Sequence, residues 1–364
     1  MSIGKVVIIT DQPIATGIGR YTWTLAKDLS KKQIDVSLLY NGYLDPGYDN
    51  KYFDVITSSL FKKTTNYLTI PLVRKMNSMA LKFYAKKYKD AIVHFCGSDY
   101  SGLKFFSNTV ATVHDIRFDL SFDFKNDAFI RNLLDSTYRD FINLKVLRDV
   151  KNAMKIISIS NVIKSDLEKH KIRSQVIHHW IDAQGFKKRD RILSKKKLGL
   201  PENSKLILNV SNGTKNKALD FLQETVNLLP EGYRLIKIGS PLKGRNILNV
   251  GKVPSELYPL YFNACDLYLN VSTFEGFGRP QIEALGSGLP VLTRDIPINR
   301  EILAEAGIYF NTYIEPSDLS KVIVHSVKGY HREELEDRME EVRRRLDEDV
   351  AISEYLKVYS SIQK

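Results

Sequence analysis

The chain has 364 residues, of which 43% are hydrophobic, and it carries a formal net charge of +12. This length favours two domains over one, and the composition is that of a globular protein rather than a disordered or fibrous one. The two cysteines, Cys96 and Cys265, belong to no Cys-x-x-Cys or Cys/His cluster, so we expect neither a disulfide framework nor a zinc site and predict a reducing, cytoplasmic setting.

The first half of the chain alternates short apolar runs with helical patterns. The apolar run at 6–9 is too short for a secretory leader and predicts a first buried strand, and no run reaches the roughly 18 residues of a transmembrane helix. Further strands are expected at 36–40, 91–95, 110–114 and 155–160, and helices at 16–31 and 160–170. The alternation predicts a doubly wound parallel sheet.

The alternation stops at 184–204, a polar, basic segment that is poor in strand-forming residues and that we interpret as a linker. It then restarts, with strands expected at 206–211, 234–239, 246–251, 266–272, 290–294 and 307–310 and a helix at 218–229. The sequence therefore predicts a Rossmann-like domain over 1–184, a second one over 185–345, and a C-terminal helix over 346–364 that packs back on the first domain. Two such domains would bind ligands at their strand ends, in the cleft between them.

The segment 272–290 combines a tight loop, a helix start and two carboxylates. Glu275 opens the loop 275–278, whose glycines let the backbone come close to a ligand. Pro280 suits the first turn of a helix, and the free amides of that turn favour an anion. Glu275 and Glu283 can each accept paired hydrogen bonds from a vicinal diol, although each alone is also typical of a surface loop or a helix start. Together they indicate a phosphorylated, hydroxyl-rich ligand.

The stretch FEGFGRPQIEALGSGLPV, residues 274–291, resembles the E-x7-E motif of the family-4 retaining glycosyltransferases. Further similar segments follow one another in the order of that family: TGIGRYTWTLAKDL from Thr16, VATVHDI from Val110, IISISNVIKSDL from Ile156, VIHHWID from Val176 and NVSNGTKNKALDFL from Asn209. Each is weak alone, but the order and spacing are specific. The resemblance implies the GT-B fold, with two Rossmann-like domains facing across a cleft, and transfer of a hexosyl group from a nucleotide-diphosphate sugar to an acceptor hydroxyl with retention of configuration.

The same resemblance assigns the donor site. Glu283 would hold the nucleotide ribose and Glu275 the hydroxyls of the donor sugar, which His114 would also contact. Lys217 would offset the charge of the leaving diphosphate. Supporting donor contacts would come from Gly17, Gly19, Lys215, Phe277 and Gly278. Members of the family generally need no essential metal ion, so we expect none, and Asp347 and Asp349 in the charged C-terminal segment are expected to be surface carboxylates.

The sequence departs from the family in its phosphate loop. Relatives commonly carry an arginine and a lysine there, whereas this chain has Lys-Asn-Lys at 215–217. Either Asn212 or Asn216 would stand at the position of the arginine. Arg279, which follows the loop 275–278, either supplies the missing positive charge or faces solvent.

The N-terminal half also carries a basic stretch. Between Lys62 and Lys89 there are eight Lys and Arg and no Asp or Glu, interleaved with aromatic and aliphatic residues. Such a stretch is typical of a peripheral, anionic membrane surface contact, and it is equally compatible with a core-facing helix that has a solvated basic face. Nucleic acid is disfavoured because no nucleic-acid-binding module accompanies the charge.

The acceptor would then be a glycan, a lipid-linked sugar or a small molecule. Two alternatives remain on the sequence alone, a GT-B sugar-nucleotide epimerase and a non-catalytic protein that binds a sugar nucleotide.

Overall fold

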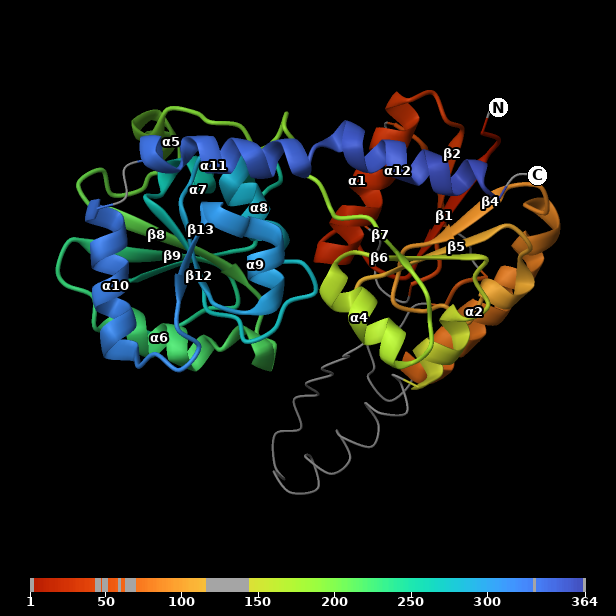
Figure 1. Cartoon of the computed structure of the whole chain (residues 1–364), viewed down its shortest axis with the longest axis horizontal. Helices are drawn as coiled ribbons and strands as arrows, with labels where there is room; N and C mark the ends of the chain where they lie inside the picture. The colour runs from red at the N-terminus through yellow and green to blue at the C-terminus, as the bar shows by residue number, and fades with distance from the viewer. Residues whose placement is uncertain are drawn as a thin grey trace, which may run out of the picture. The chain divides into compact units, whose positions relative to one another are not determined.

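The computed structural model describes residues 3–42, 47, 52–57, 60–62, 70–115, 144–329 and 332–362. It divides the chain into two compact units, Met1–His179 with Asp349–Lys364, and Trp180–Glu348. Each unit contains a parallel sheet flanked by helices (Figure 1). The expected fold class, two Rossmann-like α/β domains, is confirmed. Among the described residues, no helix is long and apolar enough to cross a membrane.

The first unit is built on a seven-stranded sheet in the order β3-β2-β1-β4-β5-β6-β7. Its strands are β1 (Val6–Thr10), β2 (Val36–Tyr40), β3 (Asp54–Ile56), β4 (Ile92–Phe95), β5 (Thr109–Val113), β6 (Lys155–Ser158) and β7 (Gln175–Val176). All residues of β1, β2, β4 and β5 are buried, as expected for parallel strands covered on both faces. The predicted strand at 155–160 ends early because Ser160 caps the next helix, its hydroxyl accepting from the amide of Ile163 at 3.2 Å.

The helices of this unit are α1 (Gly17–Lys31), α2 (Ile70–Lys87), α4 (Asn161–Lys169) and α12 (Glu348–Ser360), with a 3-10 turn η2 (Leu103–Phe105). The helix α12 returns from the end of the chain through buried polar contacts. The hydroxyl of Tyr355 lies 2.6 Å from that of Tyr21, and the hydroxyl of Tyr359 lies 2.7 Å from Nδ1 of His94. Burial, with a smaller effect of His114, lowers the pKa of His94 to about 3, so this ring is neutral at physiological pH.

The second unit has a six-stranded sheet in the order β10-β9-β8-β11-β12-β13. Its strands are β8 (Lys205–Ser211), β9 (Tyr233–Gly239), β10 (Ile247–Gly251), β11 (Leu267–Asn270), β12 (Val291–Arg294) and β13 (Gly307–Phe310). Its helices are α5 (Arg191–Lys197), α6 (Leu219–Asn227), α7 (Tyr258–Ala264), α8 (Arg279–Gly286), α9 (Pro297–Leu303), α10 (Pro316–Gly329) and α11 (Arg332–Arg345), with 3-10 turns η3 (Lys215–Lys217) and η4 (Ala304–Ala306). The strand order reverses between β8 and β11, and ligands of such sheets bind at that switch point, outside the carboxyl ends of the strands.

The interpretation of 184–204 as a linker is wrong in part, because this segment contains the helix α5. The carboxylate of Asp190 caps α5 by accepting from the amide of Leu193 at 2.7 Å. Lys195 is buried, and its ammonium donates to two backbone carbonyls of the following turn, at 3.2 and 2.8 Å. The helix packs against α7 and so belongs to the second unit.

Candidate active site

The loop after β11 and the start of α8 take the conformation that their glycines and proline predict. Gly278 has φ +85° and stands directly before α8, with Pro280 in the first turn. A side chain at Gly278 would be strained by this φ and would come within 2.2 Å of the carboxamide of Gln281. The turn therefore requires glycine, and it leaves the first amides of α8 at the carboxyl edge of the sheet.

Glu275 and Lys217 meet at the switch point. Lys217 belongs to η3, in the loop after β8, and its Nζ lies 2.6 Å from Oε1 of Glu275, in the loop after β11. The two side chains are 18% and 14% exposed, so the pair is shielded but reachable from solvent. The structure thus brings together a predicted sugar-binding carboxylate and a predicted diphosphate-binding cation.

The two asparagines of the loop after β8 make hydrogen bonds within the protein. The side-chain amide of Asn216 donates to the carbonyl of Phe274 at 2.9 Å, and its own carbonyl accepts from the amide of Thr273 at 2.8 Å. These bonds tie the loop after β8 to the loop after β11. Asn212 accepts from the hydroxyl of Thr214 at 2.7 Å and shapes its own turn. The side chain of Lys215 is exposed.

Glu283 lies about one turn into α8 and is only 2% exposed. Its carboxylate accepts from the hydroxyl of Tyr258, on α7, at 2.9 Å and lies 3.8 Å from Nε of Arg279. Arg279 is itself buried, at 8% exposure, so the alternative in which it faces solvent is wrong. The sequence analysis did not single out Tyr258, because the chain separates it from Glu283 by 25 residues and only the packing of α7 on α8 joins them.

The carboxylates of Glu275 and Glu283 both raise the pKa of one buried tyrosine. Burial raises the pKa of Tyr268, on β11, and the neighbouring Tyr258, Glu275 and Glu283 add to this effect. The two glutamates of the E-x7-E motif therefore share one electrostatic environment beneath the strand edge.

Lys237 is a further charged residue that the sequence analysis missed. It lies on β9 and is fully buried, and its Nζ donates to the carbonyl of Ser211 at 2.7 Å and to that of Ile238 at 3.0 Å. The signal in the sequence was a lysine inside the otherwise apolar run RLIKIG.

The remaining predicted residues lie in the first unit. His114 follows β5 and is 5% exposed, and its ring meets that of Tyr21 edge-on with centroids 4.7 Å apart. The amide of Gly19 donates to the hydroxyl of Thr16 at 2.9 Å, and a side chain on Gly19 would meet the carbonyl of Pro13 at 1.9 Å, so Gly19 has a packing role. A side chain on Gly17 would meet no atom of the described residues within 4 Å, which leaves that turn open to them.

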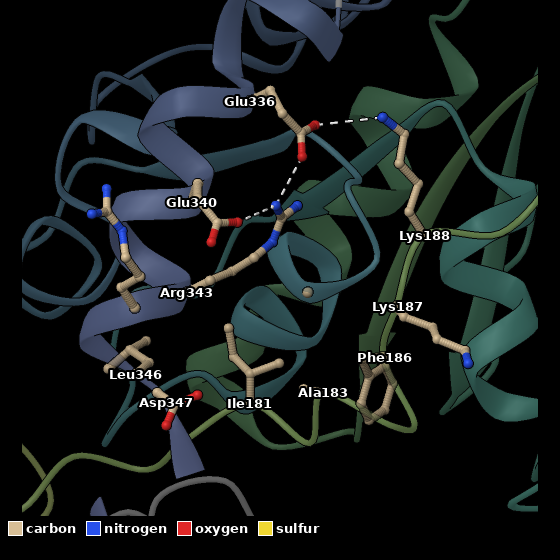
Figure 2. A pocket seen from close by; sticks show the side chains of 12 residues that line it. Ile181, Ala183, Phe186, Lys187, Lys188, Glu336, Glu340, Arg343, Leu346 and Asp347 are labelled. Carbon is tan, nitrogen blue, oxygen red and sulfur yellow. Dashed lines mark hydrogen bonds and ion pairs between the residues drawn. The ribbon is translucent and has the colours of Figure 1, made fainter. Parts of the chain in front are cut away.

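A separate cavity of about 310 Å³ lies under α11 in the second unit (Figure 2). Arg343 spans it, pairing with Glu336 at 2.8 Å and Glu340 at 3.1 Å and donating to the carbonyl of Leu285, in the last turn of α8, at 2.8 Å. None of the predicted site residues lines this cavity. We interpret it as an ion-pair cluster that fixes α11 on α8, where a cation suits the helix C-terminus.

The predicted surface role fits both C-terminal aspartates, since Asp347 and Asp349 are exposed. Asp349 pairs with Lys32 at 2.6 Å with most of its side chain exposed. Within the described parts of the chain, no three His, Cys, Asp or Glu side chains are grouped so that they could hold a metal ion.

Comparison with known families divides the chain in the same way. The model described as Glycosyltransferase Family 4 matches residues 15–184, and the model described as Glycosyl transferases group 1 matches residues 190–345. The chain has the two domains of a GT-B glycosyltransferase. The E-x7-E glutamates, Lys217 and Lys237 all fall in its group 1 domain.

Curated relatives of this chain include enzymes of O-antigen synthesis. It is 25% identical to the O-antigen biosynthesis glycosyltransferase WclY of Escherichia coli over 43% of this chain and 47% of the relative, so it spans about half the length of that protein. It is 23% identical to the O-antigen chain mannosyltransferase B of Escherichia coli over 89% of this chain and 90% of the relative.

Solved structures share the fold over nearly the whole length of this chain. The sucrose-phosphate synthase of Thermosynechococcus elongatus superposes with a TM-score of 0.79 at 16% identity, covering 99% of both chains. HepE of Anabaena, solved in complex with UDP and glucose, superposes with a TM-score of 0.76 at 16% identity, covering 98% of this chain and all of that one.

Proposed function

We propose that the protein is a retaining hexosyltransferase, which moves a sugar from a nucleotide-diphosphate sugar to an acceptor hydroxyl. The observation that carries this proposal is the pairing of Lys217 with Glu275 at the switch point of the second sheet, next to the helix start that leads to Glu283. A cation, two carboxylates and helix amides at one strand edge suit a ligand with phosphates at one end and hydroxyls at the other.

The slow part of this reaction is the loss of a nucleoside diphosphate while positive charge develops on the sugar ring. Lys217, with Lys215 and the amides at Phe277 and Gly278, would stabilise the leaving charge, because fixed cations and dipoles need no reorganisation during the step. The ion pair keeps Lys217 and Glu275 at the strand edge, where the diphosphate would compete for the ammonium and the sugar hydroxyls for the carboxylate.

Glu283 would accept the paired hydrogen bonds of the nucleotide ribose. Tyr258 and Arg279 hold its carboxylate in one orientation, which reduces the entropy lost when a ligand binds. From the first unit, His114 would contact the transferred sugar and the open turn at Gly17 would let the diphosphate approach the backbone. No essential metal ion is needed in this scheme, since the lysines and the helix start supply the positive charge.

The acceptor that we propose is a growing bacterial surface polysaccharide. This follows from the curated relatives, two of which are described as O-antigen glycosyltransferases, and a hexose such as mannose is the first donor sugar to test.

We further propose that the enzyme is cytoplasmic and peripheral, and that it binds an anionic membrane through α2. The described part of the basic stretch, 62 and 70–89, supports this, whereas 63–69 lie outside the described residues. One face of α2 exposes four large apolar side chains, Leu72, Met76, Met79 and Phe83, at 43–72% exposure. Their spacing of three or four residues places them on one stripe, and lysines at 75, 82 and 86 share it. Apolar side chains bordered by cations suit a lipid surface better than bulk water.

The test is incubation with a panel of UDP-, GDP- and ADP-hexoses, with and without a lipid-linked glycan acceptor. A transferase forms a glycosylated product and nucleoside diphosphate together, and the product keeps the anomeric configuration of the donor by NMR. Formation of an epimer or free sugar without an acceptor would indicate the epimerase, and binding with no turnover in any combination would indicate the binding protein.

A further inference from the structure

The buried lysine of β9 lies under the loop that would hold the diphosphate. Lys237 is fully buried, and its ammonium donates to the carbonyl of Ser211, the last residue of β8. The loop that contains Lys217 begins at the next residue. A second bond, to the carbonyl of Ile238, anchors the ammonium at the carboxyl end of its own strand. The lysine is therefore connected directly to the point where the loop leaves the sheet.

The buried charge of Lys237 destabilises the folded state. Burial of an ammonium costs free energy unless it is paired with an opposite charge or fully hydrogen-bonded. Lys237 has two carbonyl partners, and the described structure gives it no carboxylate partner within ion-pair distance. Burial and, to a smaller extent, repulsion from Lys217 lower its pKa to about 8. A leucine or methionine would fill the same space at no such cost.

The loop after β8 combines the lysines 215 and 217 with the asparagines 212 and 216. Its asparagines add no charge, and Lys217 is paired with Glu275, so further positive charge beside the loop would help to stabilise a leaving diphosphate. Repulsion from Lys217 is one of the two causes that lower the pKa of Lys237, so the two ammonium groups interact.

We propose that Lys237 is a positioning residue for the diphosphate: its ammonium fixes the start of the phosphate loop through Ser211 and supplies positive charge from beneath it. The proposal rests on the proposed function, since it assumes that the loop after β8 binds the diphosphate of the donor. The charged group that acts on Lys237 is Lys217, on η3, which is itself paired with Glu275 in the loop after β11.

The predicted consequence is a link between diphosphate binding and the protonation of Lys237. A bound diphosphate stabilises the charged ammonium and so raises its pKa. Binding should therefore take up a proton near and above pH 8, and the affinity should fall as the pH rises through that value. A lysine that only fills space in the core would not give this dependence.

The experiment measures the affinity of the full-length protein for UDP, GDP and ADP by calorimetry between pH 7 and 9, using the nucleotide that the wild type binds most tightly. Wild-type affinity should fall with pH by up to about tenfold, the equivalent of one unit of pKa coupling. Lys237→Met should bind about tenfold more weakly at pH 7 and show no fall. Lys237→Arg, which keeps its charge over this range, should bind well and also show no fall.

Lys195→Met is the matched control. Lys195 is also buried and also donates to two backbone carbonyls, but on α5, away from the phosphate loop in the chain. This variant should keep both the wild-type affinity and its pH dependence. If Lys237→Met does not fold, the pH profiles of affinity of wild type and Lys237→Arg still test the proposal.

The proposal is overturned if Lys237→Met keeps the wild-type affinity, if wild type and Lys237→Arg share one pH profile, or if none of the three nucleotides binds. Failure of the proposed function looks different: a nucleoside diphosphate binds with the predicted pH dependence, and no nucleotide sugar is turned over.

Discussion

Replacing Glu283 by alanine and by glutamine should show how much its carboxylate contributes to the stability of the second unit and how much to ligand binding. Glu283→Ala removes the acceptor of the Tyr258 hydroxyl and the carboxylate that lies 3.8 Å from Nε of the buried Arg279. Breaking a buried ion pair from one side costs about 3–5 kcal/mol, most of it from the charge left behind. Glu283→Gln keeps the shape and an acceptor for Tyr258 and loses only the charge, so it should cost about 1–3 kcal/mol.

The assay can follow the second unit by itself. The chain has two tryptophans, Trp23 in the first unit and Trp180, 1% exposed, at the start of the second. In a Trp23→Phe background, fluorescence during urea unfolding therefore reports Trp180. Glu283→Ala should shift the transition to lower urea by more than Glu283→Gln does. Nucleoside diphosphate affinity, measured on the folded glutamine variant, should fall by about 1–3 kcal/mol if the carboxylate holds the ribose. Equal stability of the alanine variant and wild type would refute the buried-pair reasoning, and unchanged affinity would remove Glu283 from the donor site.

Four further outcomes are expected. Lys217→Ala should lower turnover by about ten- to a thousandfold with little effect on folding, and if Lys215→Ala has the larger effect, the assignment within the loop must be exchanged. Activity should persist in excess chelator, and its loss with rescue by magnesium or manganese would exclude the metal-free scheme. Wild type should sediment with anionic vesicles at low salt and be released as salt screens the charge over about 10 Å at 0.1 M, whereas Met79→Glu with Phe83→Glu should stay in solution yet still release diphosphate from the donor. The pKa of His94 is about 3 in the folded protein, whereas its ordinary value is 6.5, so between these values the unfolded chain binds a proton that the folded protein does not. The stability of the first unit should therefore fall as the pH drops from 6.5 towards 3, and His94→Gln should flatten that dependence.

The sequence predicted those features that depend on local pattern. Apolar runs located the strands except the short β3 and β7, and the glycine and proline around Gly278 and Pro280 located the turn into α8 to within a residue. The same reasoning missed α5, because four of its seven residues are basic and its start is marked only by the Asp190 cap.

Features that depend on tertiary packing could not be predicted. The contact of Tyr258 with Glu283 forms only because α7 packs on α8. The lysine at 237 is unusual only because it is buried, and the sequence does not show that burial. The basic stretch was evident as a composition, but only the register of α2 decides that Met79 and Phe83 share its exposed stripe with lysines. Arg279 was left undecided between two surroundings for the same reason, since a residue at a helix start can face either way.

The return of α12 to the first unit has a consequence for how the protein is made. The ribosome completes residues 3–179 and then the whole second unit before it synthesises the helix that carries Tyr355 and Tyr359. Until then the hydroxyl of Tyr21 and the imidazole of His94 lack these partners in the nascent chain. Domains generally fold in order as they emerge, but here the unit that emerges first can finish last, so we expect nascent chains that stop before residue 349 to hold a protease-sensitive first unit beside a resistant second one.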